Sequence, residues 1–174
     1  IFSNFVKFLR YQISCNLSGV LIMIPITALQ LPTPLLPVHI LLLNLISETG
    51  PSIALGLEKP EGNVMAYKPR SKHERLLTRS RWYRICGEAV VLASAGIGIY
   101  FVARMYNPVL TSTAVLTTAF LSRLWQAFSC RSEQASIFSP TLARNYSLYA
   151  TVVLTLSFLG GVVYTNVGNE IFKT

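Results

Sequence analysis

The sequence predicts an all-α membrane protein, a bundle of about five transmembrane helices. The chain has 174 residues, of which 52% are hydrophobic and only 13% are charged, and its mean hydropathy is +0.48. The hydrophobic residues form long runs separated by prolines or by basic segments. Runs of about 20 residues are what a helix needs to cross the hydrocarbon core. We therefore expect a multi-pass integral membrane protein and treat residues 1–174 as a single transmembrane domain.

The basic residues indicate how the chain is oriented in the membrane. The formal net charge is +8, and eight of the 15 Lys and Arg residues lie between residues 59 and 84. A basic segment between two hydrophobic runs is typical of a cytoplasmic loop. Basic and aromatic residues do not alternate as they do in single-strand nucleic-acid binding proteins. We expect membrane lipid as a partner and no nucleic acid.

The predicted spans follow in order from this pattern. The first covers residues 5–30 and ends at a turn with three prolines, and the second covers residues 38–57. A cytoplasmic loop at 58–82 precedes the third span, 83–104, whose many small residues favour close helix packing. Asn107 and Pro108 turn the chain into the fourth span, 108–128. A second cytoplasmic loop, 129–144, leads to the fifth span, 145–165.

The second span carries polar residues where a bilayer has its apolar centre. Asn44, Ser47 and Glu48 lie inside the hydrophobic run, and Gly50 and Pro51 follow directly. Proline removes a backbone donor and clashes with the preceding turn, so we expect the helix to be broken near Glu48–Pro51. Such irregular backbone is tolerated in lipid where it lines a cavity or is buried in protein. A carboxylate at this depth indicates an ion or substrate site. The alternative is a polar contact that holds helices together.

Side-by-side packing of the first two spans would gather oxygen atoms from Asn16, Asn44, Ser47 and Glu48. Amide, hydroxyl and carboxylate oxygens are the ligands of a hard cation. One carboxylate suits a proton or a monovalent ion better than a divalent ion, unless other helices contribute ligands.

Arg123, late in the fourth span, leaves two alternatives open. Its long side chain reaches the cytoplasmic interface, or it turns inward and pairs with Glu48. The second arrangement would put a fixed cation where an exchangeable cation would sit. It would favour proton handling or a site that no longer binds an ion.

Other chemistries are excluded by composition. All seven acidic residues are Glu, so the chain has no aspartyl nucleophile and no Ser-His-Asp arrangement. The two His and three Cys residues are scattered, without zinc-site spacing. We therefore predict no catalytic residue and no certain resident metal in this chain.

Several stretches, taken together and in order, carry a family resemblance that covers essentially the whole chain. They are FLRYQISCN (8–16), LQLP (29–32), LPVH (36–39), NLISE (44–48), PSIALGLEKP (51–60), KPRS (68–71) and FSCRSE (128–133). The series resembles the C-terminal membrane region of P-type cation-transporting ATPases of the calcium-pump type. The matching part runs from the fifth helix of such a pump to just before the tenth.

The resemblance implies roles for individual residues. It assigns ion-ligand positions to Asn16, Asn44, Ser47 and Glu48. The family usually has Thr and Asp at the last two of these positions. Two departures stand out: Gly19 replaces a Glu of the fifth helix, and Arg123 replaces a Glu or Gln of the eighth.

The function that the resemblance implies is the C-terminal membrane domain of an ATP-driven P-type cation pump, with the ion site at Glu48. The alternative is a non-catalytic membrane subunit, derived from such a pump and kept as a scaffold in a larger complex. The transported cation would be H+, Ca2+ or a monovalent ion. The family's phosphorylation motif and actuator loop are absent from the sequence, so we expect no ATP hydrolysis by this chain alone. ATP and Mg2+ would act only through partner domains of the same pump.

Overall fold

The computed structural model describes residues 2–58, 77–131 and 145–165, and within these ranges all regular structure is helical. The elements are α1 (Phe2–Ala28), α2 (Pro37–Leu42), η1 (Leu43–Glu48), α3 (Thr49–Gly56), α4 (Arg79–Tyr106), η3 (Pro108–Leu110), α5 (Thr111–Ser129) and α6 (Tyr146–Tyr164). The prediction of an all-α bundle is confirmed. The predicted loops 58–82 and 129–144 lie largely outside the described residues.

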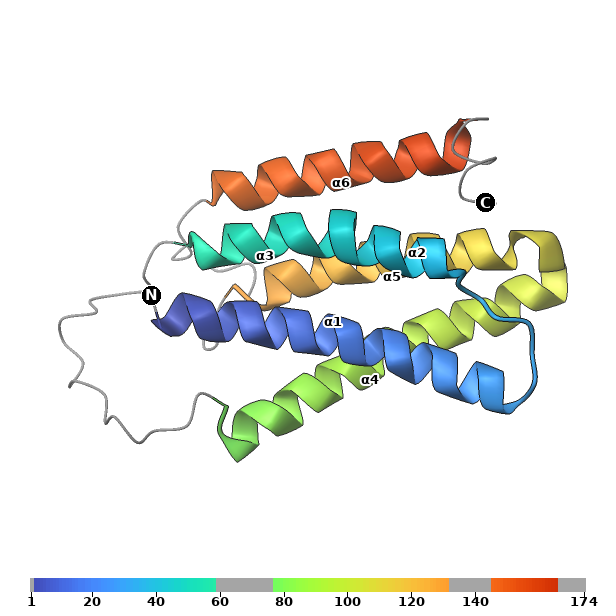
Figure 1. The fold of residues 1–174 in the computed structure, drawn as a ribbon, viewed down its shortest axis with the longest axis horizontal. Helices are drawn as coiled ribbons and strands as arrows, with labels where there is room; N and C mark the ends of the chain where they lie inside the picture. The colour runs from blue at the N-terminus through green and yellow to red at the C-terminus, as the bar shows by residue number, and fades with distance from the viewer. Residues whose placement is uncertain (1, 59–76, 132–144, 166–174) are drawn as a thin grey trace.

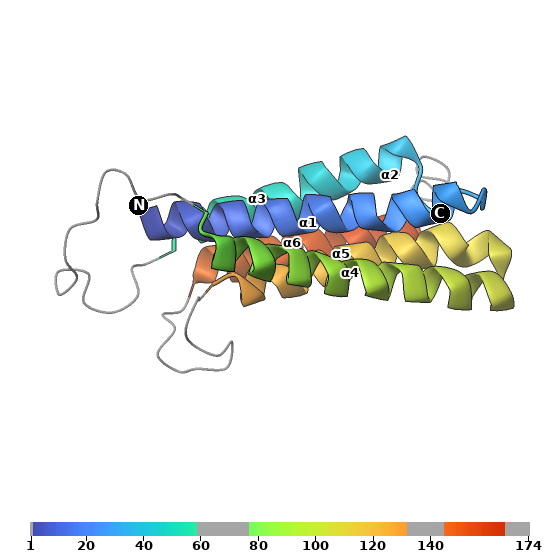
Figure 2. The ribbon, with the colours of Figure 1, turned by 90° about the horizontal axis from the view of Figure 1, so that it is seen from below.

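The helices run roughly along one long axis (Figure 1). α1 packs against α4 and α3, and α4 packs against α5. α6 lies at the edge of the bundle, against α3 and α5 (Figures 1 and 2). The α1–α2 connection and the α4–α5 turn lie at one end of the bundle, and the start of α1 lies at the other.

Within the described residues, four helical stretches are long and apolar enough to cross a membrane: Phe2–Ala28, Pro37–Gly56, Arg79–Tyr106 and Tyr146–Tyr164. α5 has 19 residues and fills the place of the fourth predicted span, but polar side chains such as Arg123 and Gln126 make it less apolar. Both of these side chains are buried, so α5 is covered by its neighbours where it is polar. The chain is a multi-pass integral membrane protein.

The interruption expected in the second span takes the form of a π-helical segment. α2, η1 and α3 follow one another without a gap from Pro37 to Gly56, and η1 is π-helical over Leu43–Glu48. The Thr49 hydroxyl donates to the Asn44 carbonyl, five residues earlier, at 3.1 Å. Single π-turns within α-helices are frequently found at functional sites. The irregular turn directly precedes Gly50 and Pro51 and ends at Glu48.

The end of α1 explains how the chain reverses. Gln30 has a left-handed backbone with φ 54°, and the Leu31 amide donates to the Ile26 carbonyl at 3.1 Å. This arrangement is a Schellman motif, which satisfies the last carbonyls of a helix. The prolines that follow prevent the helix from continuing. Pro37 then occupies the first turn of α2, where its missing N–H costs nothing.

Two glycines permit close helix contacts. A Cβ atom built on Gly96 would lie 2.5 Å from Cδ1 of Ile22, so any larger residue at this contact of α4 with α1 would force the Ile22 side chain to move. A Cβ atom on Gly50 would lie 3.1 Å from the Thr151 side chain of α6. Small residues at helix contacts are the usual means of packing in lipid.

Candidate ion-binding site

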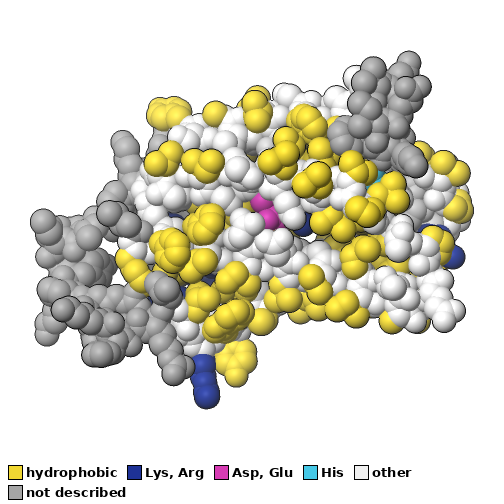
Figure 3. Space-filling view, viewed as in Figure 1, with side chains coloured by type: hydrophobic (Ala, Val, Ile, Leu, Met, Phe, Trp, Pro, Cys, Tyr) yellow, Lys and Arg dark blue, Asp and Glu magenta, His cyan; other side chains and the backbone are white. Residues whose placement is uncertain are grey.

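Glu48 is buried near the middle of the second span. It is the last residue of η1, and its side chain is 1% exposed. Figure 3 shows acidic atoms, in magenta, midway along a face that is mostly yellow or white, with basic atoms, in dark blue, beside them. A buried carboxylate in an apolar protein needs partners for its oxygen atoms.

Three side chains from two other helices supply these partners. The Nε of Arg123, on α5, donates to Oε1 of Glu48 at 2.8 Å. On α1, the amide nitrogen of Gln12 donates to Oε2 at 2.9 Å, and that of Asn16 donates to the same atom at 3.4 Å. Of the two alternatives for Arg123, the structure has the inward one. The pair joins the second span to α5 by a charge-assisted hydrogen bond.

The backbone beside Glu48 is also stabilised by a side chain of α1. Pro51 has no N–H to donate to the Ser47 carbonyl, four residues earlier. The hydroxyl of Tyr11, which is fully buried, donates to this carbonyl at 3.0 Å. A buried carbonyl without a donor costs about 1–3 kcal/mol. Tyr11 therefore compensates for the proline and fixes the position of the π-helical turn.

The structure brings together only some of the residues predicted for the site. Asn16 reaches Glu48, whereas Asn44 is exposed and makes no side-chain hydrogen bond to Glu48. Ser47 is buried, and its hydroxyl donates to the Leu43 carbonyl of its own helix at 2.9 Å. In this arrangement, Ser47 therefore uses its hydroxyl proton within the helix.

A cavity of about 240 Å³ adjoins the ion pair. It is lined by Asn16, Gly19, Val20, Met23, Ile24, Leu35, Ile40, Leu43, Asn44 and Arg123. Asn44 is thus on the wall of a cavity that also contains Asn16 and the arginine. A Cβ atom on Gly19 would lie 3.7 Å from Nη2 of Arg123, which is an ordinary contact. The guanidinium therefore faces the cavity next to Gly19.

Sequence reasoning missed two members of the site. Gln12 was not singled out, although it lies four residues before Asn16 and hence on the same helix face. Its amide oxygen accepts from the Ser52 hydroxyl of α3 at 3.0 Å. Ser52 therefore fixes the orientation in which Gln12 presents its N–H to Glu48.

The other two described carboxylates belong to separate networks. Glu88 of α4 accepts from Nε of Arg10 at 3.0 Å, and Gln126 donates to it at 2.7 Å. Gln126 also lies 3.4 Å from Sγ of Cys130, just past α5, and burial raises the pKa of this thiol to about 12. No group of three or more His, Cys, Asp or Glu side chains is placed to hold a metal within the described residues.

Glu58 forms the third network, at the end of the second span. It accepts from Arg131, which follows α5, at 2.8 Å and 3.0 Å. Asn145, the N-cap of α6, donates to its other oxygen at 3.1 Å. Glu58 is 5% exposed and does not line the cavity beside Arg123.

Comparison of the sequence with known proteins places the chain in a family. Residues 32–174 match the family described as "Cation transporting ATPase, C-terminus". The chain belongs to this family. Among its relatives are a "Calcium-transporting ATPase" of Bacillus subtilis, 32% identical over 177 residues, and "Calcium-transporting ATPase lmo0841" of Listeria monocytogenes, 27% identical over 173 residues. The human "Calcium-transporting ATPase type 2C member 2" is 28% identical over 178 residues.

These matches cover nearly all of this chain but a small part of each relative. They include 99–100% of the chain and 19–20% of the relatives' length. The chain therefore spans about a fifth of the cation transporting ATPases that it matches. Gly19 and Arg123, the two positions at which we expect a departure from the calcium-pump pattern, both line the cavity, and a Cβ atom on Gly19 would lie 3.7 Å from Nη2 of the arginine.

Proposed function

We propose that this chain is the C-terminal membrane domain of an ATP-driven P-type cation pump and that the cation binds at Glu48. The relatives named above are calcium-transporting ATPases, which favours a pump over a scaffold subunit and makes Ca2+ the first cation to test. ATP hydrolysis would belong to partner domains outside this chain. Asn16, Asn44 and Ser47 are the further candidate ligands.

The observation that carries the proposal is a buried carboxylate beside a π-helical turn and a cavity. Glu48 is enclosed at mid-span, and the adjoining cavity contains the amides of Asn16 and Asn44. A carboxylate at this depth is energetically costly, and in membrane proteins such a residue usually has a function. Irregular backbone is tolerated where it lines a cavity. Carboxylate and amide oxygens can replace the water of a hard cation.

The hydrogen bonds describe the site without a cation. N–H groups of Arg123, Gln12 and Asn16 occupy the Glu48 oxygens, so these oxygens are not free to bind a cation. For a cation to bind, the two amides must present oxygen instead of nitrogen, and the guanidinium must move from the carboxylate. Arg123 would thus be the fixed cation that neutralises Glu48 when the transported cation has left. A proton or another cation then competes with Arg123 for the same carboxylate.

The test uses the intact pump in proteoliposomes, with ATP turnover measured as a function of Ca2+ concentration and of pH. In Glu48→Gln we expect cation-stimulated turnover to fall to the unstimulated level. Glu58→Gln is the matched control, because it removes the charge of a buried glutamate that also pairs with an arginine, and we expect it to keep cation-stimulated turnover. Unchanged stimulation in Glu48→Gln would rule out this residue as a ligand. Isolation of a mature 19.3 kDa chain with no ATP-hydrolysing chain attached would rule out the pump.

A further inference from the structure

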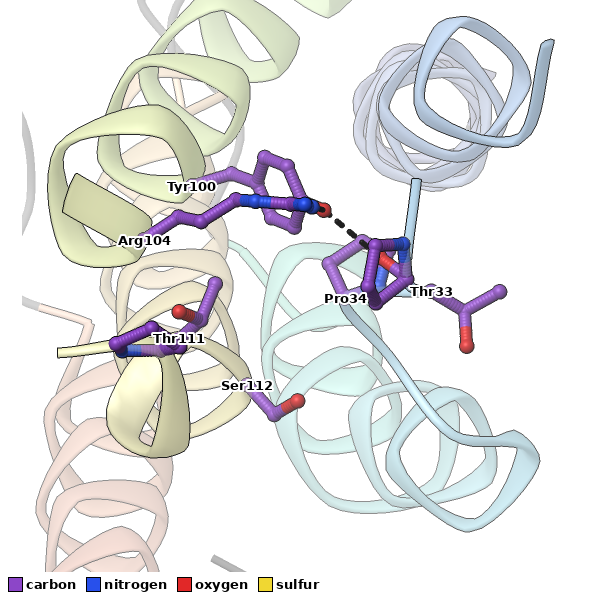
Figure 4. Close-up of a pocket in the computed structure, with 8 residues that line it drawn as sticks. Thr33, Pro34, Tyr100, Arg104, Thr111 and Ser112 are labelled. Carbon is purple, nitrogen blue, oxygen red and sulfur yellow. Dashed lines mark hydrogen bonds between the residues drawn. The ribbon is translucent and has the colours of Figure 1, made fainter. Parts of the chain in front are cut away.

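A second cavity lies at the C-terminal end of α4 and is not lined by Glu48. It has a volume of about 230 Å³ and is lined by Pro32, Thr33, Pro34, Tyr100, Arg104, Pro108, Thr111 and Ser112. Figure 4 shows Tyr100 and Arg104 of α4 facing Thr33 and Pro34, with Thr111 and Ser112 at the start of α5 on a third side. The cavity therefore lies among three segments at the end of the bundle that holds the α1–α2 connection.

The guanidinium of Arg104 is held in place at this cavity by a neutral group. Its Nη1 donates to the Tyr100 hydroxyl at 2.8 Å, and this hydroxyl donates to the Pro32 carbonyl at 2.8 Å. Tyr100 is 1% exposed, so the chain of hydrogen bonds has a rigid base. Arginine has five N–H donors in a planar fork. One of them is used here, and the others remain available to a ligand.

The charge of Arg104 is not balanced within the described part of the chain. The three described carboxylates pair with other arginines: Glu48 with Arg123, Glu58 with Arg131, and Glu88 with Arg10 and Arg84. Within the described residues, Arg104 contacts the hydroxyl and the ring of Tyr100. An anion in the cavity would complete its hydrogen bonds, and a phosphate oxygen fits the guanidinium fork well.

The surroundings of the cavity fit a ligand with an apolar part. Met105, Tyr106 and Val109, in the turn between α4 and α5, are 85–89% exposed. At the end of a bundle of membrane spans, such side chains contact lipid at the level of the headgroups. An arginine at this level can bind the phosphate of a lipid headgroup through its guanidinium N–H groups. A ligand that combines a phosphate with acyl chains would use both features.

We propose that this cavity binds the phosphodiester of an anionic phospholipid, with Arg104 as the anion-binding group and the α4–α5 turn as the surface for the acyl chains. The proposal is independent of ion transport at Glu48. The bound lipid would join the α1–α2 connection to α4 and α5 at the membrane interface.

The experiment is native mass spectrometry of the intact, delipidated protein in mild detergent, titrated with phosphatidylglycerol. We expect one phosphatidylglycerol to be retained by the wild type and its affinity to fall at least about tenfold in Arg104→Gln, because a hydrogen bond to a charged group is lost. The matched control is Arg79→Gln, which removes an exposed arginine from the other end of the same helix and should bind lipid like the wild type. Equal lipid retention in the two variants would overturn the proposal.

Two further ligands separate the parts of the phospholipid. Diacylglycerol has the chains without the phosphate, and inorganic phosphate has the charge without the chains. We expect neither to displace phosphatidylglycerol at equal concentration; displacement by either one would overturn the proposal. Ser112→Leu fills the cavity and leaves Arg104 in place, so it decides the case if Arg104→Gln does not fold. We expect it to weaken lipid binding as well, and unchanged binding in Ser112→Leu would contradict the site.

Discussion

Two buried glutamate–arginine pairs connect the second span to α5, and they differ in what surrounds them. Glu48 with Arg123 lies at mid-span, next to a π-helical turn and a cavity. Glu58 with Arg131 lies past the ends of the helices and lines neither described cavity. Each glutamate lies 2.8 Å from an arginine nitrogen and also accepts a hydrogen bond from a side-chain amide. Burial and pairing alone therefore do not distinguish Glu48 from Glu58; the adjoining cavity and the π-helical turn do.

Removal of either arginine tests whether the two pairs are equally important for stability. We expect Arg123→Ala and Arg131→Ala each to lower the free energy of unfolding by about 3–5 kcal/mol, because each leaves a buried carboxylate without its charged partner. Thermal unfolding in detergent measures this. The double variants Arg123→Ala/Glu48→Gln and Arg131→Ala/Glu58→Gln should recover most of the loss. An unaltered melting temperature in Arg123→Ala would mean that its guanidinium reaches the interface instead of Glu48.

A milder change at the same arginine separates the pairs by function. In Arg123→Gln the fixed cation that competes for Glu48 is gone, so we expect the cation concentration for half-maximal turnover to fall about tenfold, which corresponds to 1.4 kcal/mol. Arg131→Gln should leave this concentration unchanged. The measurement is turnover of the intact pump against cation concentration. A higher half-maximal concentration in Arg123→Gln would show that Arg123 supports binding and does not compete with it.

The hydrogen bond from Tyr11 tests the feature that only the Glu48 pair has. In Tyr11→Phe we expect a loss of about 1–3 kcal/mol of stability, because the Ser47 carbonyl loses its donor inside the bundle. The double variant Tyr11→Phe/Pro51→Ala restores a backbone N–H for this carbonyl and should lose less. Chemical denaturation of the two variants in detergent gives the comparison. Equal losses in both would show that Pro51 is not the reason for the Tyr11 contact.

The smallest effect is expected at Gly19. A methyl group here would make an ordinary contact with Arg123, and alanine favours a helix over glycine by about 1 kcal/mol. We therefore expect Gly19→Ala to be neutral or slightly stabilising in thermal unfolding. Gly96→Ala is the contrasting variant, since its Cβ would clash with Ile22, and overpacking of this kind costs about 1–3 kcal/mol. Similar melting temperatures for the two variants would contradict the close approach of α1 and α4.

The sequence was sufficient to predict the class of fold and the central carboxylate. Long hydrophobic runs predicted the helices. A glutamate inside one of these runs predicted a functional site, because ionisable residues are rare within transmembrane segments. The position of Gly50 and Pro51 predicted irregular backbone near Glu48, but not that the helix would widen into a π-turn. The hydrogen bond from Tyr11 to the Ser47 carbonyl in this turn comes from another helix and could not be predicted from the second span alone.

The contacts between helices were less predictable. Whether Arg123 points inward depends on the rotation of α5 about its axis. This rotation depends on how α5 packs against its neighbours, η1 among them. The contacts of Gln12 and Ser52 were not predicted, because neutral amides and hydroxyls are common in membrane spans. Their role depends on which helix face they lie on, and the sequence alone does not give this. Asn44 was predicted from its spacing to Glu48, yet it lies exposed on the cavity wall. The ligand roles of Asn16, Asn44, Ser47 and Glu48 stay predictions.

The π-helical turn has a geometric consequence for the second span. It holds one residue more per turn than the α-helix around it, and each residue of an α-helix corresponds to a rotation of about 100° about the axis. A change of Leu43–Glu48 from π-helical to α-helical would therefore rotate one half of the span about its own axis, relative to the other half, by about the 100° of one residue. The carboxylate would leave the guanidinium while the two ends of the span stayed almost in place.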